Sequence, residues 1–312
     1  MGALGKVLII GGAGFIGSNL VRALVEHGGV HSILDRPEAD FGRLSVFQDR
    51  LRVYRGTLQE LDIIEKILYR DGITTVVHLV SGMLPSSPEE ALRKEEECII
   101  KPTRALLPML ENHGCRLVFV SSGGAIYGEG GKTPLCEDDP PCPTSHYGKA
   151  KQMLEEAILR YSAMKDLSHL VIRPSNPYGR FQNNSGTQGF VAVATGRVLK
   201  GEELTIWGDG SIVRDYLHVD DLMAGMLGLM DHPASRGVYN LGSGRGHRLT
   251  EVLSIIEEIS GLKARVRFTQ GRACDPGANV LDIRKVQSLI PYVPRSLEDG
   301  LRIYVEEVKV RG

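Results

Sequence analysis

The chain has 312 residues, of which 42% are hydrophobic and 24% are charged, and its formal net charge is −1 at pH 7. These values are close to globular averages and leave room for one large domain or two coupled ones. The near-neutral charge does not point to a nucleic acid or a membrane surface as a partner, and no apolar run reaches the roughly 18 residues that span a bilayer.

The first half of the chain alternates two kinds of segment. Short runs rich in β-branched residues suit strands that are buried on both faces, and strands are predicted at Lys6–Ile10, Ser32–Leu34, Arg52–Tyr54, Thr75–Val80, Leu117–Val120 and Leu170–Ile172. Helices are predicted between them, at Ser18–Glu26, Leu61–Tyr69, Pro88–Asn112 and Ser145–Tyr161. This alternation predicts an α/β fold with a parallel sheet and right-handed crossovers.

The composition changes after Arg173. Residues 174–189 are rich in Pro, Asn, Gly and Ser, which is typical of an irregular loop. Further elements are predicted as a helix near Phe190–Lys200, a strand near Leu204–Trp207, a helix at Val219–Met230 and a strand at Val238–Leu241. Thr250 is predicted to cap a last strong helix that stops at Gly261. We expect a second domain that interleaves with the first.

Cysteine and histidine usage bears on location and metals. The five cysteines form no C-x-x-C pair, which is typical of reduced thiols in a cytosolic protein. None of the nine histidines belongs to an H-E-x-x-H motif, and no metal is predicted. We expect no signal peptide before the first strand, and the cytoplasm as the location.

A glycine-rich turn joins the first strand to the first helix. Gly12-Ala-Gly14-Phe-Ile-Gly17 fits G-x-G-x-x-G, and Gly11, Gly14 and Gly17 fit the version with a spacing of three. Glycines allow a tight turn and a close approach of the backbone to a pyrophosphate, which the N-terminus of the next helix then faces. Asp35, 18 residues past Gly17 at the end of the second strand, suits a ribose 2′-hydroxyl.

The same residues bear on which dinucleotide binds. The carboxylate of Asp35 favours NAD over NADP, because it would repel a 2′-phosphate. The neighbouring Arg36 leaves NADP open, since an arginine at this place could bind that phosphate. A merely structural turn is the alternative to a dinucleotide site. The structural alternative is disfavoured because the turn follows a strand and opens a helix, and because Asp35 ends the next strand, where a ribose contact is expected.

A second motif is Tyr147-Gly-Lys-Ala-Lys151, in which a spacing of four places Tyr147 and Lys151 on one face of a helix. A free phenol has a pKa near 10, so a tyrosine base at neutral pH needs a pKa lower by roughly three units, about 4 kcal/mol. A nearby ammonium and a positively charged nicotinamide ring could supply this. The spacing alone also occurs by chance; behind a dinucleotide turn it predicts an acid/base pair.

Five segments resemble the extended short-chain dehydrogenase/reductase family, especially UDP-glucose 4-epimerase and its bacterial nucleotide-sugar relatives. They are Gly11–Asn19, Ser121–Gly128, Tyr147–Lys151, Arg173–Gly179 and Trp207–Asp221. The match spans nearly the whole chain, and the last segment is specific to nucleotide-sugar enzymes. The resemblance implies a Rossmann-type doubly wound domain with bound NAD at 1–173 plus about 212–241. It also implies a smaller, interleaved nucleotide-sugar domain at about 174–211 and 242–312, and a homodimer through two helices per subunit.

The resemblance assigns roles by position. It makes Tyr147 the base, Lys151 its modulator and ribose contact, and Ser122 its hydroxyl partner. Ser122 lies 25 residues before Tyr147, as in the epimerases; counting back from Tyr127 would instead select Gly123, which cannot perform the role. The implied cofactor contacts are Gly11, Gly14, Phe15, Ile16, Gly17, Asp35, Arg36, Thr57, Leu58, Leu79, Val80, Ser81, Tyr147 and Lys151. The implied substrate contacts are Asn176, Gln188, Gly189, Arg214, Arg272 and Asp275.

Arg214 and Arg272, on the substrate side, suit the two phosphates of a diphosphate. The alternative for each is a solvated charge on the surface.

The chain also departs from the family pattern in three places. Gly56-Thr57-Leu58 replaces a usual Gly-Asp-hydrophobic, which removes an acidic contact to the adenine. Glu95–Thr103 lacks the usual asparagines near the nicotinamide, and His78-Leu-Val-Ser-Gly82 is an unusual loop after the fourth strand. These departures bear on cofactor retention and on the substrate.

The leading hypothesis is reversible epimerisation at C4 of a UDP-hexose through a transient 4-keto sugar. A 4,6-dehydratase is disfavoured, because related dehydratases place Asp-Glu directly after the Ser/Thr, where this chain has Gly123 and Gly124, or Gly124 and Ala125. A nucleotide-sugar 4-ketoreductase would use the same Tyr147, Lys151 and Ser122 and stays open. A non-catalytic NAD-binding protein is a further alternative.

Overall fold

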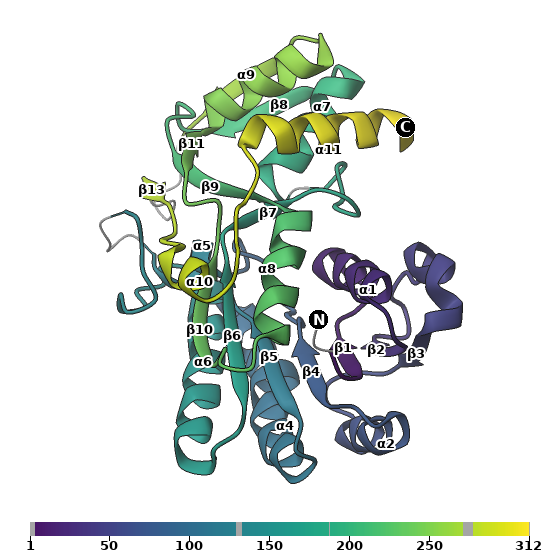
Figure 1. The fold of residues 1–312 in the computed structure, drawn as a ribbon. Coiled ribbons are helices and arrows are strands. Elements are labelled where there is room, and N and C mark those ends of the chain that lie inside the picture. Colours follow the sequence, from purple (N-terminus) through teal and green to yellow (C-terminus); the bar gives the residue numbers. More distant parts are fainter. Residues whose placement is uncertain (1–3, 129–132, 187, 271–276, 312) are drawn as a thin grey trace.

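A seven-stranded parallel sheet is the centre of the larger of two lobes (Figure 1). The structure, a computed structural model, describes residues 4–128, 133–186, 188–270 and 277–311. The strand order is β10-β6-β5-β4-β1-β2-β3. The strands are β1 Val7–Ile10, β2 His31–Asp35, β3 Leu51–Arg55, β4 Thr75–His78, β5 Arg116–Val120, β6 His169–Pro174 and β10 Gly237–Leu241. The order reverses between β1 and β4, which confirms the doubly wound α/β fold. In such sheets ligands bind outside the carboxyl ends of the strands at this point.

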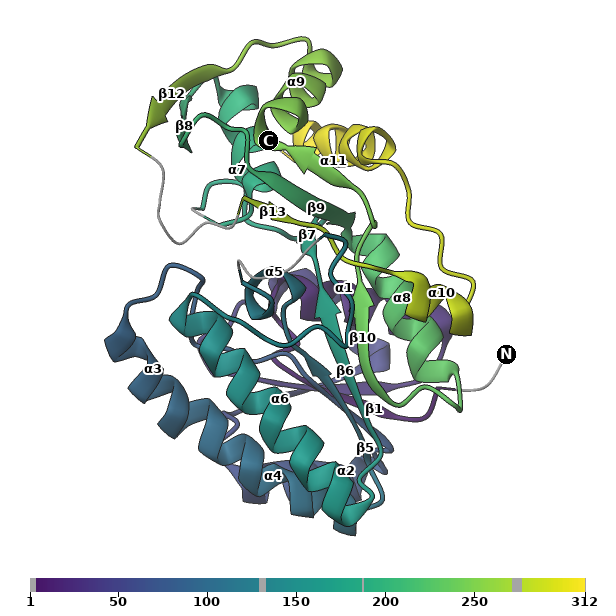
Figure 2. The same ribbon diagram turned by 90° about the vertical axis from the view of Figure 1, so that its left-hand side faces the viewer.

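Helices cover both faces of this sheet. One face packs against α1 (Phe15–His27), η1 (Gly42–Arg50), α8 (Val219–Asp231) and α10 (Arg284–Leu289). The other packs against α2 (Leu61–Asp71), α4 (Lys101–Asn112) and α6 (His146–Lys165), and Figure 2 shows α4 and α6 side by side with α3 (Glu89–Glu95). Successive side chains of a strand point to opposite faces, so all four residues of β1 are buried.

The smaller lobe contains two further sheets. β9 (Val213–His218) pairs with β7 (Asn176–Tyr178), β11 (Gly246–Arg248) and β13 (Ala278–Asn279), while β8 (Glu203–Trp207) pairs with β12 (Arg265–Thr269). Helices α7 (Phe190–Lys200), α9 (Leu249–Ser260) and α11 (Leu297–Arg311) pack over a separate core. Between β9 and β11 the chain returns to the larger lobe as α8 and β10. The predicted domain boundaries stay predictions; β9, inside the predicted segment 212–241, pairs within the smaller lobe.

Three helix predictions differ from the structure. Pro88–Asn112 is not one regular helix, because the π-helical turn η2 (Glu96–Ile100) separates α3 from α4. Gly261 ends α9 in the left-handed conformation, but Thr250 lies inside the first turn instead of capping it. Strand β11 pairs with β9 as far as Arg248, so the helix can begin directly at Leu249. Finally, α11 follows the helix that was predicted as the last strong one.

Candidate active site

The glycine-rich turn lies at the carboxyl end of β1. Gly11 has a φ of 88°, and its N–H donates to the carbonyl of Leu34 on β2 at 2.8 Å. A Cβ on Gly17 would lie 2.4 Å from the Gly11 carbonyl oxygen, so only a glycine lets α1 start this close to the turn. A Cβ on Gly14 would meet no described atom nearer than 3.6 Å. The open space at Gly14, in front of the α1 N-terminus, fits a pyrophosphate.

Asp35 joins the end of β2 to this turn. Its carboxylate accepts hydrogen bonds from the N–H of Ala13 at 2.9 Å and from the N–H of Arg36 at 2.8 Å. Asp35 is half-buried, whereas the Arg36 side chain is exposed. A carboxylate beside the glycine-rich turn can accept hydrogen bonds from the hydroxyls of a ribose. The residues present therefore fit NAD. Two further predicted contacts, Phe15 and Ile16, are half-buried in the first turn of α1.

The loop after β3 carries an acidic side chain that the sequence reasoning missed. The N–H and the hydroxyl of Thr57 donate to Oε2 of Glu60, at 2.7 and 3.0 Å, while Leu58 is buried. A carboxylate therefore stands at this loop, although position 57 is a threonine. The spacing Thr-x-x-Glu, which is that of a capping box, was the available signal for it.

The loop after β4 faces the turn, since a Cβ on Gly11 would lie 3.2 Å from Val80 Cγ2. The fully buried His78 shapes this loop: Nδ1 accepts from the N–H of Val80 at 3.2 Å, and Nε2 lies 2.9 Å from Thr103 Oγ1. Burial lowers the pKa of His78 to about 3, so the imidazole is neutral at pH 7. The predicted cofactor contacts in this loop, Leu79, Val80 and Ser81, are all half-buried.

Close packing of α6 on the short helix α5 (Gly123–Ile126) brings Tyr147 to Ser122. Ser145 caps α6 by accepting a hydrogen bond from the N–H of Gly148 at 3.1 Å. A Cβ on Gly148 would lie 2.5 Å from the carbonyl oxygen of Ala125, so the glycine permits this contact. The Ser122 side chain, at the N-cap of α5, hydrogen-bonds with the Tyr147 phenol.

Lys151 is buried one turn further along α6. Its Nζ donates to the carbonyl of Val120 at 3.0 Å and lies 5.8 Å from the centroid of the Tyr147 ring. Burial lowers the pKa of Lys151 to about 8, whereas the carboxylates of Glu95 and Glu155 raise it. The ammonium is therefore still the major form at pH 7.

The protein environment as a whole raises the pKa of Tyr147. Burial raises the pKa of this phenol to about 12; the hydrogen bond with Ser122 lowers it and the Glu95 carboxylate raises it. A tyrosine base at neutral pH thus needs a positive charge from outside the chain. A bound nicotinamide ring in its oxidised form would carry such a charge.

A cavity of about 200 Å³ in the smaller lobe holds part of the predicted substrate contacts. Asn176, Gly189 and Arg214 line it, and Asn176 Nδ2 donates to the Asp215 carbonyl at 2.9 Å. Gln188 is exposed beside it, and Arg272 and Asp275 lie outside the described residues. Sequence reasoning missed the lining aromatics Trp207 and Tyr216, although both belong to the segment that carries the resemblance.

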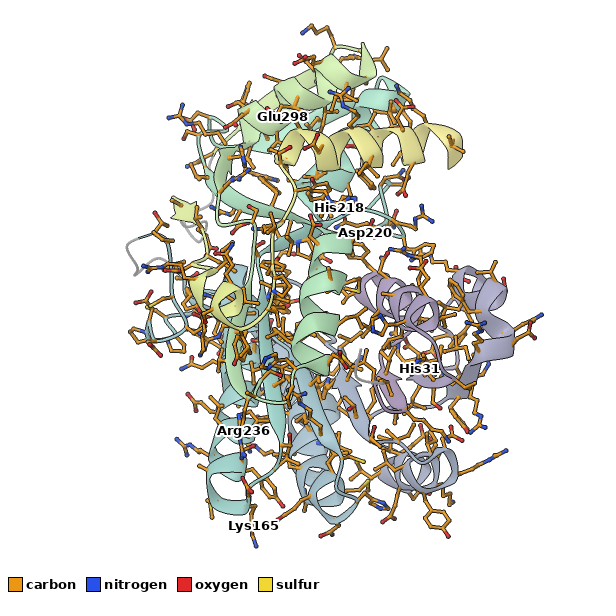
Figure 3. All side chains as sticks on the ribbon, in the orientation of Figure 1. His31, Lys165, His218, Asp220, Arg236 and Glu298 are labelled. Atoms are coloured by element: carbon orange, nitrogen blue, oxygen red, sulfur yellow. The ribbon has the colours of Figure 1, made fainter. Side chains whose placement is uncertain are left out.

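The junction between the lobes ties the cofactor side to the substrate side. Figure 3 shows His218 and Asp220 where β9 meets α8. His218 Nδ1 accepts from the N–H of Asp220 at 3.2 Å, and the Asp220 carboxylate pairs with Arg22 of α1. The helix that follows the glycine-rich turn is therefore linked to a strand of the smaller lobe.

The described residues were also searched for metal-ligand groups, paired cysteines and membrane-spanning helices. None of their His, Cys, Asp or Glu side chains form a group of three or more that could hold a metal ion. Cys98, Cys115, Cys136 and Cys142 are free thiols, and Cys274 lies outside the described residues. No helix in these ranges is both long enough and apolar enough to cross a membrane.

Comparisons with known proteins show similarity over nearly the whole chain. A UDP-glucose 4-epimerase from Thermotoga maritima, solved with UDP-glucose, is 31% identical, with coverage of 98% of this chain and 99% of that one, and a TM-score of 0.90. A UDP-glucose 4-epimerase from Thermus thermophilus, solved with NAD, is 29% identical over 97% and 99% of the two chains, with a TM-score of 0.89. A dTDP-4-dehydro-6-deoxyglucose reductase from Escherichia coli is 29% identical over 98% of both chains.

The fold and the glycine-rich turn define the class of protein as an NAD-dependent enzyme of the extended short-chain dehydrogenase/reductase type. The profile of the NAD dependent epimerase/dehydratase family matches residues 7–242. The chain belongs to this family, and its cofactor is NAD.

Proposed function

We propose that this protein is a nucleotide-sugar 4-epimerase that reversibly inverts C4 of a UDP-hexose through a transient 4-keto sugar. The observation that carries the proposal is the convergence of Tyr147, Ser122 and Lys151 at the carboxyl edge of the sheet, the edge at which the glycine-rich turn also lies. The similarity to two UDP-glucose 4-epimerases over nearly the whole chain supports the same reaction and the same nucleotide.

Each residue of the site has a distinct task in this reaction. NAD, which the glycine-rich turn and Asp35 would hold, would supply the acceptor for a hydride from C4 and the donor that returns it to the opposite face of the ketone. Ser122 orients the C4 hydroxyl, and Tyr147 Oη takes its proton and later gives that proton back, so the reaction has no net redox change. Acid/base help of this kind contributes about 10²–10⁴ in rate. The Lys151 ammonium favours the phenolate form of the base.

The residues after Ser122 disfavour dehydration, which needs a further acid and base near C5 and C6. A Cβ on Gly123 would lie 2.7 Å from Leu281 Cδ1 and 3.1 Å from the Pro174 carbonyl oxygen, so a side chain there would have to displace the buried Leu281. Space exists at Gly124, where the nearest atom would be 3.6 Å away, but the chain places no acid there. An epimerase needs neither group.

A nucleotide-sugar 4-ketoreductase is the second candidate, favoured by the similarity to the Escherichia coli reductase. Such an enzyme would consume reduced cofactor in every turnover, whereas an epimerase restores its cofactor. Heat denaturation of the purified protein separates the two. Released NAD supports the epimerase, while no bound nucleotide together with NADPH-dependent turnover supports the reductase.

The proposed activity is tested by incubating the protein with UDP-glucose or UDP-N-acetylglucosamine and separating the products chromatographically. We expect the C4 epimer to form without added reductant. Tyr147→Phe should lower the rate by about 10²–10⁴ and keep nucleotide binding, because it removes only the reacting hydroxyl. Tyr161→Phe makes the same change on the same helix, where the hydroxyl pairs with Glu111, and should stay active. A fully active Tyr147→Phe would refute the assigned base.

We also propose a homodimer in the cytoplasm. Support for the dimer comes from the groove between α4 and α6, which is about 580 Å³ in volume. It is lined by the apolar side chains of Leu107, Met153, Ala157 and Met164, by Tyr161, and by the charged side chains of Arg104, Glu156 and Arg160. Met164 is 80% exposed in the single chain, and a partner subunit would cover it. The free thiols Cys98, Cys115, Cys136 and Cys142 are consistent with a reducing compartment.

A further inference from the structure

A strained turn follows β7, where the two lobes meet. Phe181 has a φ of 69°, in the left-handed region that residues other than glycine rarely adopt. The N–H of Gln182 donates to the carbonyl of Gly179 at 3.1 Å, which closes the turn Gly179–Gln182. A strained residue persists only where its surroundings fix it, and such residues gather at sites that clamp ligands. The groups that fix Phe181 are therefore of functional interest.

Side chains of the larger lobe hold the backbone of this turn at two points. Asn19 of α1 is fully buried, and its Nδ2 donates to the carbonyl of Arg180 at 2.7 Å. Arg43 of η1 is exposed, and its Nη1 donates to the carbonyl of Phe181 at 2.8 Å. The side chain of Arg180 binds the smaller lobe, where its Nε donates to Oε1 of Glu307 on α11 at 3.0 Å. The two peptide groups that flank Phe181 are thus each fixed by one side chain of the larger lobe.

The same turn joins two stretches of chain that line the cavity of the smaller lobe. Nε2 of Gln182 donates to the carbonyl of Pro177 at 3.4 Å. A Cβ on Gly189 would lie 2.4 Å from that Nε2, so the Gln182 side chain lies directly against the backbone of Gly189. Pro177 and Gly189 both line the cavity of about 200 Å³. The position of the turn therefore decides where this wall of the cavity lies.

Asn19 belongs to the glycine-rich segment, but its neighbour Ser18 is the residue that holds the glycine-rich turn. The N–H of Ser18 donates to the carbonyl of Gly14 at 2.8 Å, and its hydroxyl donates to the carbonyl of Ala13 at 3.2 Å. Nδ2 of Asn19 instead donates to the carbonyl of Phe15, within α1 itself, and to the turn after β7. Two adjacent buried residues of α1 thus bind different sites.

We infer that Asn19 and Arg43 are positioning residues for the nucleotide-sugar site, because they hold the Gly179–Gln182 turn in its strained form and thereby fix the wall of the cavity. The inference rests on the proposed function, which assigns a UDP-sugar to the substrate contacts of this cavity. It predicts that two residues of the larger lobe set the affinity for UDP and leave the affinity for NAD unchanged.

The test measures the two affinities separately, UDP by calorimetry with NAD present and NAD by equilibrium dialysis. Asn19→Ala should weaken UDP binding by roughly tenfold, since the turn loses a buried hydrogen bond and relaxes, and should change the NAD affinity by less than about twofold. Arg43→Ala removes an exposed contact and should weaken UDP binding by roughly threefold, again without a change in NAD affinity.

Two matched controls separate positioning from general damage. Ser18→Ala truncates the neighbouring buried residue and removes its hydrogen bond to Ala13, so it should show the opposite pattern, weaker NAD binding with unchanged UDP affinity. Arg50→Ala makes the same change as Arg43→Ala on the same helix, η1. Nη1 of Arg50 donates to the carbonyl of Val25 at 3.3 Å instead of to the turn, so both affinities should stay at their wild-type values.

Wild-type UDP affinity in Asn19→Ala and Arg43→Ala overturns the inference, and so does an equal loss of UDP and NAD affinity. If Asn19→Ala does not fold, Arg43→Ala decides alone, because its exposed side chain can be removed without opening the core.

A wild-type protein that binds no UDP refutes the proposed function instead, and limited trypsin digestion then decides whether the turn is held. Arg180 is the only Lys or Arg in residues 174–189, so mass spectrometry identifies a cut in this turn by the fragment 1–180. Faster cleavage after Arg180 in Arg43→Ala than in Arg50→Ala supports the positioning role, and equal rates overturn it.

Discussion

Gly14 and Gly17 lie in the same turn, but for different physical reasons. Gly17 has no room for a Cβ, which would lie 2.4 Å from the Gly11 carbonyl oxygen. Gly14 has room and an extended backbone, with φ −72° and ψ −180°, that any residue can adopt. We expect Gly17→Ala to lower the free energy of unfolding by about 1–3 kcal/mol, as overpacking does.

Gly14→Ala should instead leave the unfolding of NAD-free protein unchanged and weaken NAD binding about tenfold, a loss of about 1.4 kcal/mol. The reason is that the added methyl group would occupy the space in which the backbone meets the pyrophosphate. Urea unfolding and equilibrium dialysis of both variants are the measurements. If Gly14→Ala binds NAD with wild-type affinity, the pyrophosphate does not lie against the backbone at Gly14.

His78 makes the stability of the protein depend on pH. Burial lowers its pKa to about 3 in the folded chain, from an ordinary value of 6.5. The unfolded chain therefore binds the extra proton first, and stability falls as the pH drops below about 6.5, by up to roughly 1.4 kcal/mol per pH unit. Urea unfolding at pH 7.5 and pH 5 should show a smaller loss in His78→Gln than in the wild type. Equal losses in the two proteins would refute the neutral, buried state.

Among the secondary structure elements, α6 and β6 are joined by a buried ion pair. Arg173 binds Glu155 through Nη2 at 2.6 Å, and its Nη1 donates to the Tyr127 hydroxyl at 2.9 Å. Arg173→Met would leave the Glu155 carboxylate buried without a partner, which costs about 3–5 kcal/mol of unfolding free energy. The double variant Arg173→Met with Glu155→Met should be more stable than the Arg173→Met single variant in urea unfolding. A loss below about 1 kcal/mol in the single variant would show that the pair is not needed.

The central strands and the glycine-rich turn were predictable because their signals are local. The runs at β1, β5 and β6 are buried on both faces, and Gly11, Gly14 and Gly17 follow β1 directly. By contrast, β12 has the partly exposed pattern of an edge pair, with arginines at 265 and 267, and was not predicted. Its pairing with β8 is parallel and non-local, so the sequence around it carries no signal.

The same contrast holds within the candidate site. The spacing of Tyr147 and Lys151 on one helix is visible in the sequence. The hydrogen bonds from the Ser81–Gly82 loop to Glu95 are not visible there, because they depend on how α3 and that loop meet in space. Likewise, the raised pKa of Tyr147 follows from burial, which a motif does not reveal.

For the complete protein, the proposed dimer makes a prediction about Met164. This side chain is 80% exposed next to the groove between α4 and α6. Met164→Asp should shift the protein towards monomer in sedimentation equilibrium, because the added carboxylate would have to lose its water at the interface. Val293→Asp makes the same kind of change at an 88% exposed residue that does not line this groove, and should leave the assembly unchanged. A Met164→Asp protein that assembles like the wild type would exclude this interface.

The two lobes together are expected to hold one sugar while its C4 loses and regains a hydrogen. UDP-glucose carrying deuterium at C4 follows that atom directly when it is incubated with the purified protein and no added cofactor, and the product is examined by NMR. We expect UDP-galactose that retains deuterium at its inverted C4, because the hydride leaves and returns within one pocket. Deuterium lost to solvent, or no C4 epimer from any UDP-hexose, would contradict the proposed reaction.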